Sequence, residues 1–142
     1  MMKQLVMLLL LALSNASPNS YQITLPNGLK INAEIAKDKQ KGLQGRKSLC
    51  PSCGMIFIFD SEGYYRFWMK DTLINLAILW INNNGKIVNV VKDAKPCLGK
   101  QNPNAECEVY LPFSPAKYVL EVNPKAASGI GVDMEIKSKP SL

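Results

Sequence analysis

The sequence predicts an α+β domain dominated by an antiparallel sheet, curled or closed into a small barrel, with one or two short helices. Three observations support this fold class. Short runs rich in β-branched and aromatic residues recur about eight times, tight-turn sequences join most of them, and only two stretches favour a helix. The chain has 142 residues, of which 47% are hydrophobic, so we expect one domain with a substantial core.

The first predicted element is a β-hairpin. Residues 21–25 and 29–35 supply its two arms, and Pro26-Asn27-Gly28 lies between them. An Asn-Gly pair favours the positive φ angles of a tight turn, so the two arms should lie side by side.

A short polar helix is predicted over residues 36–46. This segment lacks β-branched residues and is rich in Lys and Gln. Gly42 or Gly45 would end the helix, and Asp38 would lie near its N-terminus, where a negative charge is favourable.

Two strands are predicted in the next segment. The apolar run 55–59 is typical of a buried strand, and residues 60–63 have the composition of a turn. Residues 64–70 would then form the following strand.

The strongest hairpin signal comes from residues 78–82 and 86–91, which flank Asn83-Asn84-Gly85. The first arm is apolar throughout, which predicts a strand covered on both faces. Further short strands are predicted over residues 109–111, 118–122 and 134–137. A single helical turn is predicted over residues 124–128, ended by Gly129.

Residues 1–16 are predicted to be a cleaved signal peptide. Lys3 precedes an apolar run at residues 5–13, and Ser14-Asn15-Ala16 offers small residues at the cleavage point. The run is shorter than the roughly 20 residues that span a bilayer, so an uncleaved anchor is the less favoured alternative. The mature chain would be one globular domain, residues 17–142, without a transmembrane segment, in the periplasm or secreted.

All four cysteines lie in the predicted mature domain, at Cys50, Cys53, Cys97 and Cys107. An even number of cysteines in an exported domain indicates two disulfides, and local pairing of Cys50 with Cys53 and of Cys97 with Cys107 is favoured among three connectivities. A Cys-Pro-x-Cys thiol–disulfide exchange site and a four-thiolate zinc site are the alternatives. We expect neither a metal nor a cofactor.

The charge pattern narrows the possible partners. There are 17 Lys and Arg, 11 Asp and Glu and no His, which gives a net charge of +6. The absence of His removes the commonest general base and the commonest zinc ligand. The cations are not clustered as in nucleic-acid-binding domains, so we expect no nucleic-acid partner, and we expect a monomer.

Residues 66–72 mix large aromatic side chains with charges at the spacing of a strand. A period of two places Arg66, Trp68 and Lys70 on one face, and Phe67 and Met69 on the other. In one interpretation, Trp68 only covers the sheet between two solvated cations. In the other, an exposed Trp flanked by cations binds a ligand with a flat or apolar body and a negative group.

Four blocks of the sequence resemble the domain-of-unknown-function 192 family: residues 42–46 (GLQGR), 54–59 (GMIFIF), 67–74 (FWMKDTLI) and 115–122 (PAKYVLEV). The resemblance runs from about residue 31 to residue 136, with the blocks in the family's order and spacing. Members are small bacterial and archaeal proteins that are often exported. The resemblance implies a compact β-rich domain and no established reaction, substrate or cofactor.

The chain departs from this family at two places. The family typically continues its third block with Ile-Pro-Leu-Asp, whereas this chain has Ile74-Asn75-Leu76-Ala77, so a carboxylate is missing at Ala77. The Cys50–Cys53 pair is an addition to a loop that is more often acidic or polar.

Arg46, Trp68 and Lys70 are the candidate ligand-binding residues at positions that match the family. The guanidinium of Arg46 is suited to a carboxylate or phosphate, although an Arg in this place can also hold loop carbonyls. No residue is assigned a catalytic role.

Three functions are compatible with the sequence. The favoured one is a non-catalytic binding or accessory module of the cell envelope, for an anionic small molecule, a glycan or a protein partner, because no nucleophile–base motif is present. The second is an envelope hydrolase that uses Asp71, Glu121 or Asp93 with Lys70 as an electrostatic helper. The third is a structural or interaction protein that uses a sheet edge or the loop between Cys97 and Cys107.

Overall fold

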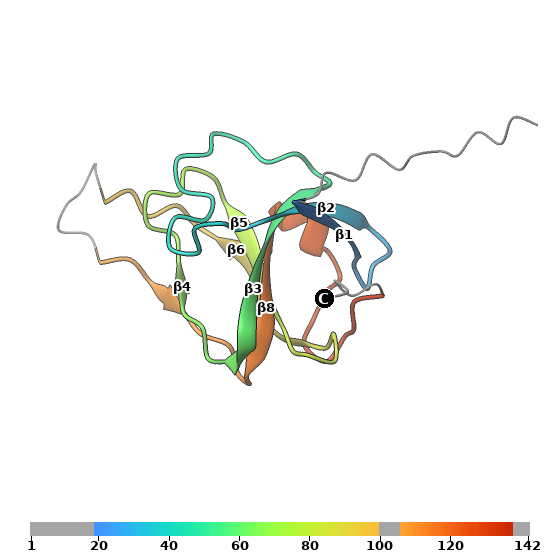
Figure 1. Ribbon diagram of the computed structural model, residues 1–142. Coiled ribbons are helices and arrows are strands. Elements are labelled where there is room, and N and C mark those ends of the chain that lie inside the picture. The colour runs from blue at the N-terminus through green and yellow to red at the C-terminus, as the bar shows by residue number, and fades with distance from the viewer. Residues whose placement is uncertain (1–18, 100–105, 138–142) are drawn as a thin grey trace, which may run out of the picture.

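The computed structural model describes residues 19–99 and 106–137. They form a mostly β domain built on one open, mixed sheet, with a second sheet of two short strands beside it (Figure 1). The large sheet has the order β1-β2-β3-β8-β5-β6. Its strands are β1 (Ser20–Thr24), β2 (Lys30–Ile35), β3 (Cys53–Gly63), β8 (Ala116–Val122), β5 (Leu76–Ile81) and β6 (Ile87–Ala94).

The prediction of a barrel and of an α+β fold is wrong. The strand order ends at β1 and β6, which do not pair with each other, and β2 and β3 run parallel in a sheet that is otherwise antiparallel. The only helical element among the described residues is the 3₁₀ turn η1 (Pro124–Ala127). Residue patterns indicate strands, but they do not show whether the two edge strands meet.

Both predicted hairpins are confirmed. Strands β1 and β2 pair across the turn that contains Gly28, whose φ is +89°. Strands β5 and β6 pair across Asn83-Asn84-Gly85, and Gly85 has a φ of +82°. Every residue of β5 is buried, as its continuous apolar run predicts.

The predicted helix over residues 36–46 does not form, and turns occupy most of this segment. Gly42 and Gly45 have the positive φ angles of helix-ending glycines, +49° and +77°, but the residues before Gly42 form bends and turns only. Asp38 does not cap a helix; its Oδ1 accepts the backbone N–H groups of Gln40 and Lys41 at 3.0 and 3.1 Å. A short polar side chain of this kind stabilises a turn as readily as a helix start.

Three other segments depart from the prediction by more than a few residues at a strand end. Strand β3 continues through residues 60–63, which were expected to form a turn. Within residues 64–70 only β4 (Phe67–Trp68) is a strand, and it pairs with β7 (Val109–Tyr110) in the small sheet. Residues 134–137 contribute an isolated bridge between Lys86 and Glu135 in place of a strand.

Hydrophobic layers cover both faces of the large sheet. One face packs against the 3₁₀ turn η1 and the following residues Ile130 and Ile136. The opposite face packs against residues of the segment between β2 and β3, including Leu43, and against Phe67 and Met69. In Figure 1 the segment between β2 and β3 is the cyan loop above the sheet, and the orange η1 packs against β5 and β6.

The predicted signal peptide, residues 1–16, lies outside the described residues, as does part of the loop between Cys97 and Cys107. Among the residues described, no helix is long and apolar enough to cross a membrane.

Candidate functional site

A cavity of about 420 Å³ opens on the face of the large sheet that packs against Leu43, Phe67 and Met69. It lies between the sheet and the two segments that contain these residues. Its wall residues come from the turn at residues 39–44, from the segment 66–72 and from the sheet itself. They are Lys39, Gln40, Lys41, Gly42, Leu43, Gln44, Phe57, Arg66, Phe67, Trp68, Thr72 and Glu121. The volume lies within the range of ordinary small-molecule pockets.

Of the residues in the described ranges, Glu121 is the one acid in the wall of this cavity. It lies on β8, where it is opposite Met55 of β3 and Ile78 of β5, and its side chain therefore shares their face of the sheet. Only 4% of its surface is exposed, and its Oε2 has no hydrogen-bond partner among the described residues. Burial raises the pKa of Glu121 to about 8, because a charged carboxylate loses its hydration there. The carboxyl is therefore mostly protonated at neutral pH.

The turn above Glu121 requires a glycine. The φ of Gly42 is +49°, and its N–H donates to the carbonyl of Asp38 at 3.0 Å. A β-carbon at position 42 would lie 3.0 Å from Cζ of Phe57 and 3.9 Å from Oε2 of Glu121. The backbone at Gly42 thus comes close to the carboxyl and to the Phe57 ring at the same point of the wall.

The segment 66–70 has the alternation that a period of two predicts. Phe67 and Met69 are buried in the hydrophobic layer that also contains Leu43, whereas Arg66, Trp68 and Lys70 are exposed. Trp68 is 47% exposed, and Nζ of Lys70 lies 5.2 Å from the centroid of its ring. Lys70 is not in the wall of the cavity, but its ammonium group occupies a position beside the Trp68 ring.

The chain after Trp68 is held in place by backbone hydrogen bonds to Cys97. The N–H of Asp71 donates to the Cys97 carbonyl at 2.8 Å, and the Cys97 N–H donates to the Met69 carbonyl at 3.1 Å. The Asp71 carbonyl in turn accepts the N–H of Gly45 at 3.0 Å. The segment with Trp68 is thereby tied both to Cys97 and to the turn that covers Glu121.

The two predicted local disulfides are confirmed. Cys50 is bonded to Cys53, and Cys97 to Cys107. Because all four sulfur atoms are paired in this way, they do not form the four-thiolate zinc site that the sequence left open. The Cys97–Cys107 disulfide anchors the backbone that holds the Trp68 segment.

Arg46 lies apart from Trp68 and Lys70. Its Nη2 donates to Oε1 of Glu34 at 2.5 Å, and both side chains are exposed. Arg46 lines a second, larger cavity of about 1460 Å³ beside β2, which includes neither Trp68 nor Glu121. The three candidate binding residues therefore do not converge on one cavity.

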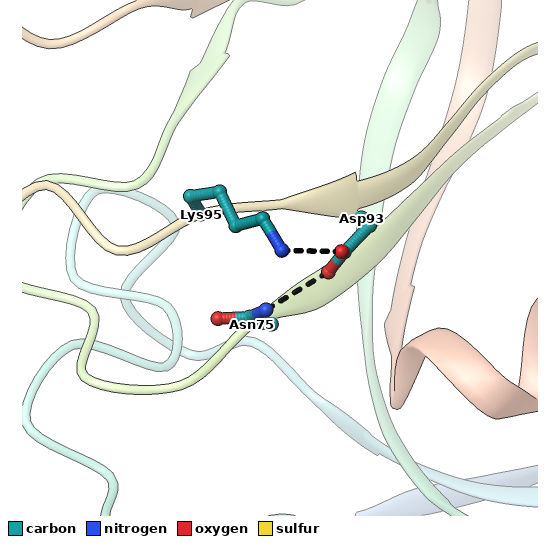
Figure 2. A network of polar contacts seen from close by, with 3 residues as sticks. All are labelled: Asn75, Asp93 and Lys95. Carbon is teal, nitrogen blue, oxygen red and sulfur yellow. Dashed lines mark hydrogen bonds and ion pairs between the residues drawn. The ribbon is translucent and has the colours of Figure 1, made fainter.

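The acidic residues considered for catalysis are also separated. Asp71 lines the larger cavity and Glu121 the smaller one. Asp93 is exposed and receives hydrogen bonds from Lys95 at 2.5 Å and from Asn75 at 3.0 Å, as Figure 2 shows. The hydrogen bond from Lys95 lowers the pKa of Asp93, which keeps this carboxylate ionised and already paired.

Ala77 lies on the other face of the large sheet from Glu121, in the hydrophobic layer that contains η1. It is fully buried, and it packs in the cluster that includes Leu79 and Val122. Its neighbour Ile78 shares the face of Glu121, so a side chain at position 77 points to the other side of the sheet. The carboxylate that the family typically has here would not reach the cavity of Glu121.

Sequence reasoning named Glu121 only as one of three acids. The signal that singles it out is an acid within the apolar run 118–122, at a position that sheet alternation places on a covered face. Lys39 and Lys41 were assigned to a polar helix and not to a site. Their place at the cavity depends on the turns of residues 39–44, which the sequence pattern did not predict.

Comparisons with known proteins agree with this architecture. The model of the DUF192 family, described as Uncharacterized ACR, matches residues 22–138. The crystal structure of "a putative transcription regulator" from Sinorhizobium meliloti 1021 is similar, with a TM-score of 0.68 and 25% identity over 82% of this chain and 89% of that one. A protein of unknown function from Novosphingobium aromaticivorans DSM 12444 has the same fold, with a TM-score of 0.70 and 24% identity over 84% of each chain. No curated protein matches the sequence. Since the family model covers most of the sequence, in agreement with the four blocks, this chain belongs to the DUF192 family.

Proposed function

We propose that this domain is an exported, non-catalytic binding module of the cell envelope, which takes a small anionic molecule into the cavity of Glu121. The observation that carries the proposal is the buried Oε2 of Glu121, which has no hydrogen-bond partner among the described residues and lies in a cavity wall that also contains Lys39, Lys41, Arg66 and the exposed Trp68. A buried polar group without a hydrogen bond costs roughly 1–3 kcal/mol, so a ligand that supplies the missing bond gains that energy.

The composition of the wall supports a ligand with a negative group. Among the described residues, the cavity is lined by the cations Lys39, Lys41 and Arg66 and by one acid, Glu121. Burial keeps the carboxyl of Glu121 mostly neutral. The attraction of three cations is therefore not cancelled by Glu121 at neutral pH. The Trp68 ring offers a flat apolar surface for the remainder of the ligand.

Two features support export. Disulfides form and persist mainly in oxidising compartments, and this domain has two. The N-terminal residues 1–16 have the composition of a cleaved signal peptide.

Tryptophan fluorescence tests the binding proposal. The chain has two Trp residues, and Trp80 is fully buried, so a ligand in the cavity should change the emission of Trp68 alone. We expect small carboxylates, phosphates or acidic sugars to change the emission of the wild-type protein, and the change to disappear in Trp68→Phe. The double variant Lys41→Ala/Arg66→Ala should weaken binding, whereas Lys47→Ala, at an exposed cation outside the cavity, should not. Equal binding by both variants would place the ligand elsewhere.

The hydrolase hypothesis has weaker support. Acid–base hydrolysis by two carboxyls needs both groups at the same bond, and the part of the chain that the structure describes places no second acid in the cavity of Glu121. Turnover of an envelope substrate that is lost in Glu121→Gln would favour an enzyme over a binding module.

One surface favours the protein-partner alternative. Val109, Leu111 and Phe113 are exposed at alternate positions, and Val109 is opposite Trp68 in the small sheet. If this strip is a protein interface, a Leu111→Asp substitution should abolish a specific crosslinked complex without affecting the fluorescence response to small anions.

A further inference from the structure

We infer that the ligand of this cavity is a small zwitterion, whose cationic nitrogen binds Glu121 and whose negative group meets Lys39, Lys41 and Arg66. This inference rests on the proposed function, and it specifies the class of molecule that the same cavity takes.

The inner part of the cavity is suited to a cation. Glu121 offers a buried oxygen without a partner, and an ionised carboxylate accepts hydrogen bonds only. The rings of Phe57 and Phe67 also line this region, with their centroids 4.8 Å apart in an edge-to-face arrangement. Aromatic rings attract ammonium groups, so the rings and the carboxyl favour the same kind of ligand group.

The other charged residues of the wall favour an anion. Among the described residues, the further charged side chains that line the cavity are Lys39, Lys41 and Arg66, and all three are exposed. Charged hydrogen bonds from Lys and Arg are strong with carboxylate and phosphate groups.

Neither a simple anion nor a simple cation pairs opposite charges both with Glu121 and with the exposed cations of the wall. A plain carboxylate would pair with the exposed cations and can accept the O–H of protonated Glu121, but it brings no positive charge to pair with the ionised form of this carboxyl. A plain amine would pair with Glu121 but would lie close to three like charges. A molecule with both groups pairs each of its charges with the opposite charge, and the volume of about 420 Å³ suits a molecule of the size of an amino acid.

Binding should be linked to loss of one proton. The carboxyl of free Glu121 is mostly protonated at pH 7, since its pKa is about 8. An incoming ammonium group keeps its own protons and stabilises the carboxylate, so the Glu121 proton passes to the solvent. The complex should therefore form with release of up to one proton near neutral pH, and the affinity should rise with pH until the carboxyl of free Glu121 is ionised.

Isothermal titration calorimetry tests the inference with matched probes. The probes are 6-aminohexanoate with its shorter and longer homologues, phosphoethanolamine, and the corresponding simple carboxylates, phosphates and amines. We expect at least one zwitterion to bind about tenfold more tightly than its matched carboxylate, as one additional charged hydrogen bond would produce. The enthalpy measured in two buffers of different ionisation enthalpy should report the released proton.

Substitutions of acidic residues identify the group that binds the cationic nitrogen of the ligand. Glu121→Gln should remove both the preference for the zwitterion and the proton release, whereas Glu135→Gln, at an exposed acid outside the cavity, should change neither. If carboxylates and zwitterions bind equally and without proton release, the inference is overturned while the proposed function stands. If no carboxylate, phosphate or zwitterion binds to the wild-type protein, both the inference and the proposed function are overturned. This outcome does not depend on the folding of any variant.

Discussion

The stability of this domain should depend on the ionisation of Glu121, and the substitution Glu121→Gln isolates that dependence. Burial raises the pKa of this carboxyl from an ordinary value of 4.5 to about 8 in the folded state. The folded state therefore holds the proton more tightly than the unfolded state does. The contribution of Glu121 to stability is therefore largest below pH 4.5, is lost as the pH rises through the interval from 4.5 to 8, and is constant above pH 8.

The size of the effect follows from the two pKa values. Each pH unit in this interval lowers the free energy of unfolding by about 1–1.5 kcal/mol. Full ionisation of Glu121 therefore lowers it by about 4–5 kcal/mol. This is an upper limit, because water that enters the cavity would reduce the effect of ionisation. Gln has the same shape and no charge. The variant should therefore be several kcal/mol more stable than the wild type at pH 8.5, and about equal to it or less stable at pH 4.5.

Urea denaturation of the oxidised proteins at pH 4.5, 6, 7 and 8.5 measures this difference. The other titrating groups are shared by both proteins, so the difference between their curves reports Glu121 alone. Glu135→Gln is the control, since Glu135 is exposed and should leave the pH dependence unchanged. A difference between wild type and Glu121→Gln that is constant across this pH range would refute the reasoning.

Three further predictions concern the elements around the site and the export of the chain. Gly42→Ala should destabilise the fold by about 1–3 kcal/mol more than Gly45→Ala in urea denaturation, because both have positive φ but only position 42 lacks room for a β-carbon; equal losses would show that the Phe57 contact is not limiting. Replacing the Cys97–Cys107 disulfide by two Ala should cost about 2–3 kcal/mol and broaden the Trp68 emission, since this bond anchors the backbone that holds Trp68; an unchanged emission would contradict that anchoring role. The intact mass of protein from the native cell should lack the first sixteen residues and four hydrogens, and a full-length reduced species would contradict export.

The hairpins could be predicted from the sequence because their signal is local. Asn83-Asn84-Gly85 dictates a tight turn, and the uninterrupted apolar run after Asn75 requires cover on both faces, so β5 and β6 follow directly. The local disulfides were predictable for the same reason, since cysteines three and ten residues apart meet before distant ones do.

The open sheet and the site depend on contacts between distant segments. The polar residues 36–46 have a helical composition, but their positive-φ glycines and the hydrogen bond from Gly45 to Asp71 hold them in turns over the sheet. Arg46 and Trp68 are matched family positions that the fold assigns to different cavities. The apolar run 118–122 marks Glu121 as an acid on a covered face of the sheet, but the cavity beside it depends on the turn of Gly42, which no residue spacing reveals.

A carbon-13 NMR titration of the side-chain carboxyl groups tests most directly the claim that Glu121 is a buried carboxyl without a partner in a ligand cavity. The account predicts one Glu resonance with a pKa near 8, absent from Glu121→Gln, which moves to a lower pKa when a zwitterionic ligand binds. A spectrum of the folded protein in which every Glu titrates near its ordinary value of 4.5 would contradict it.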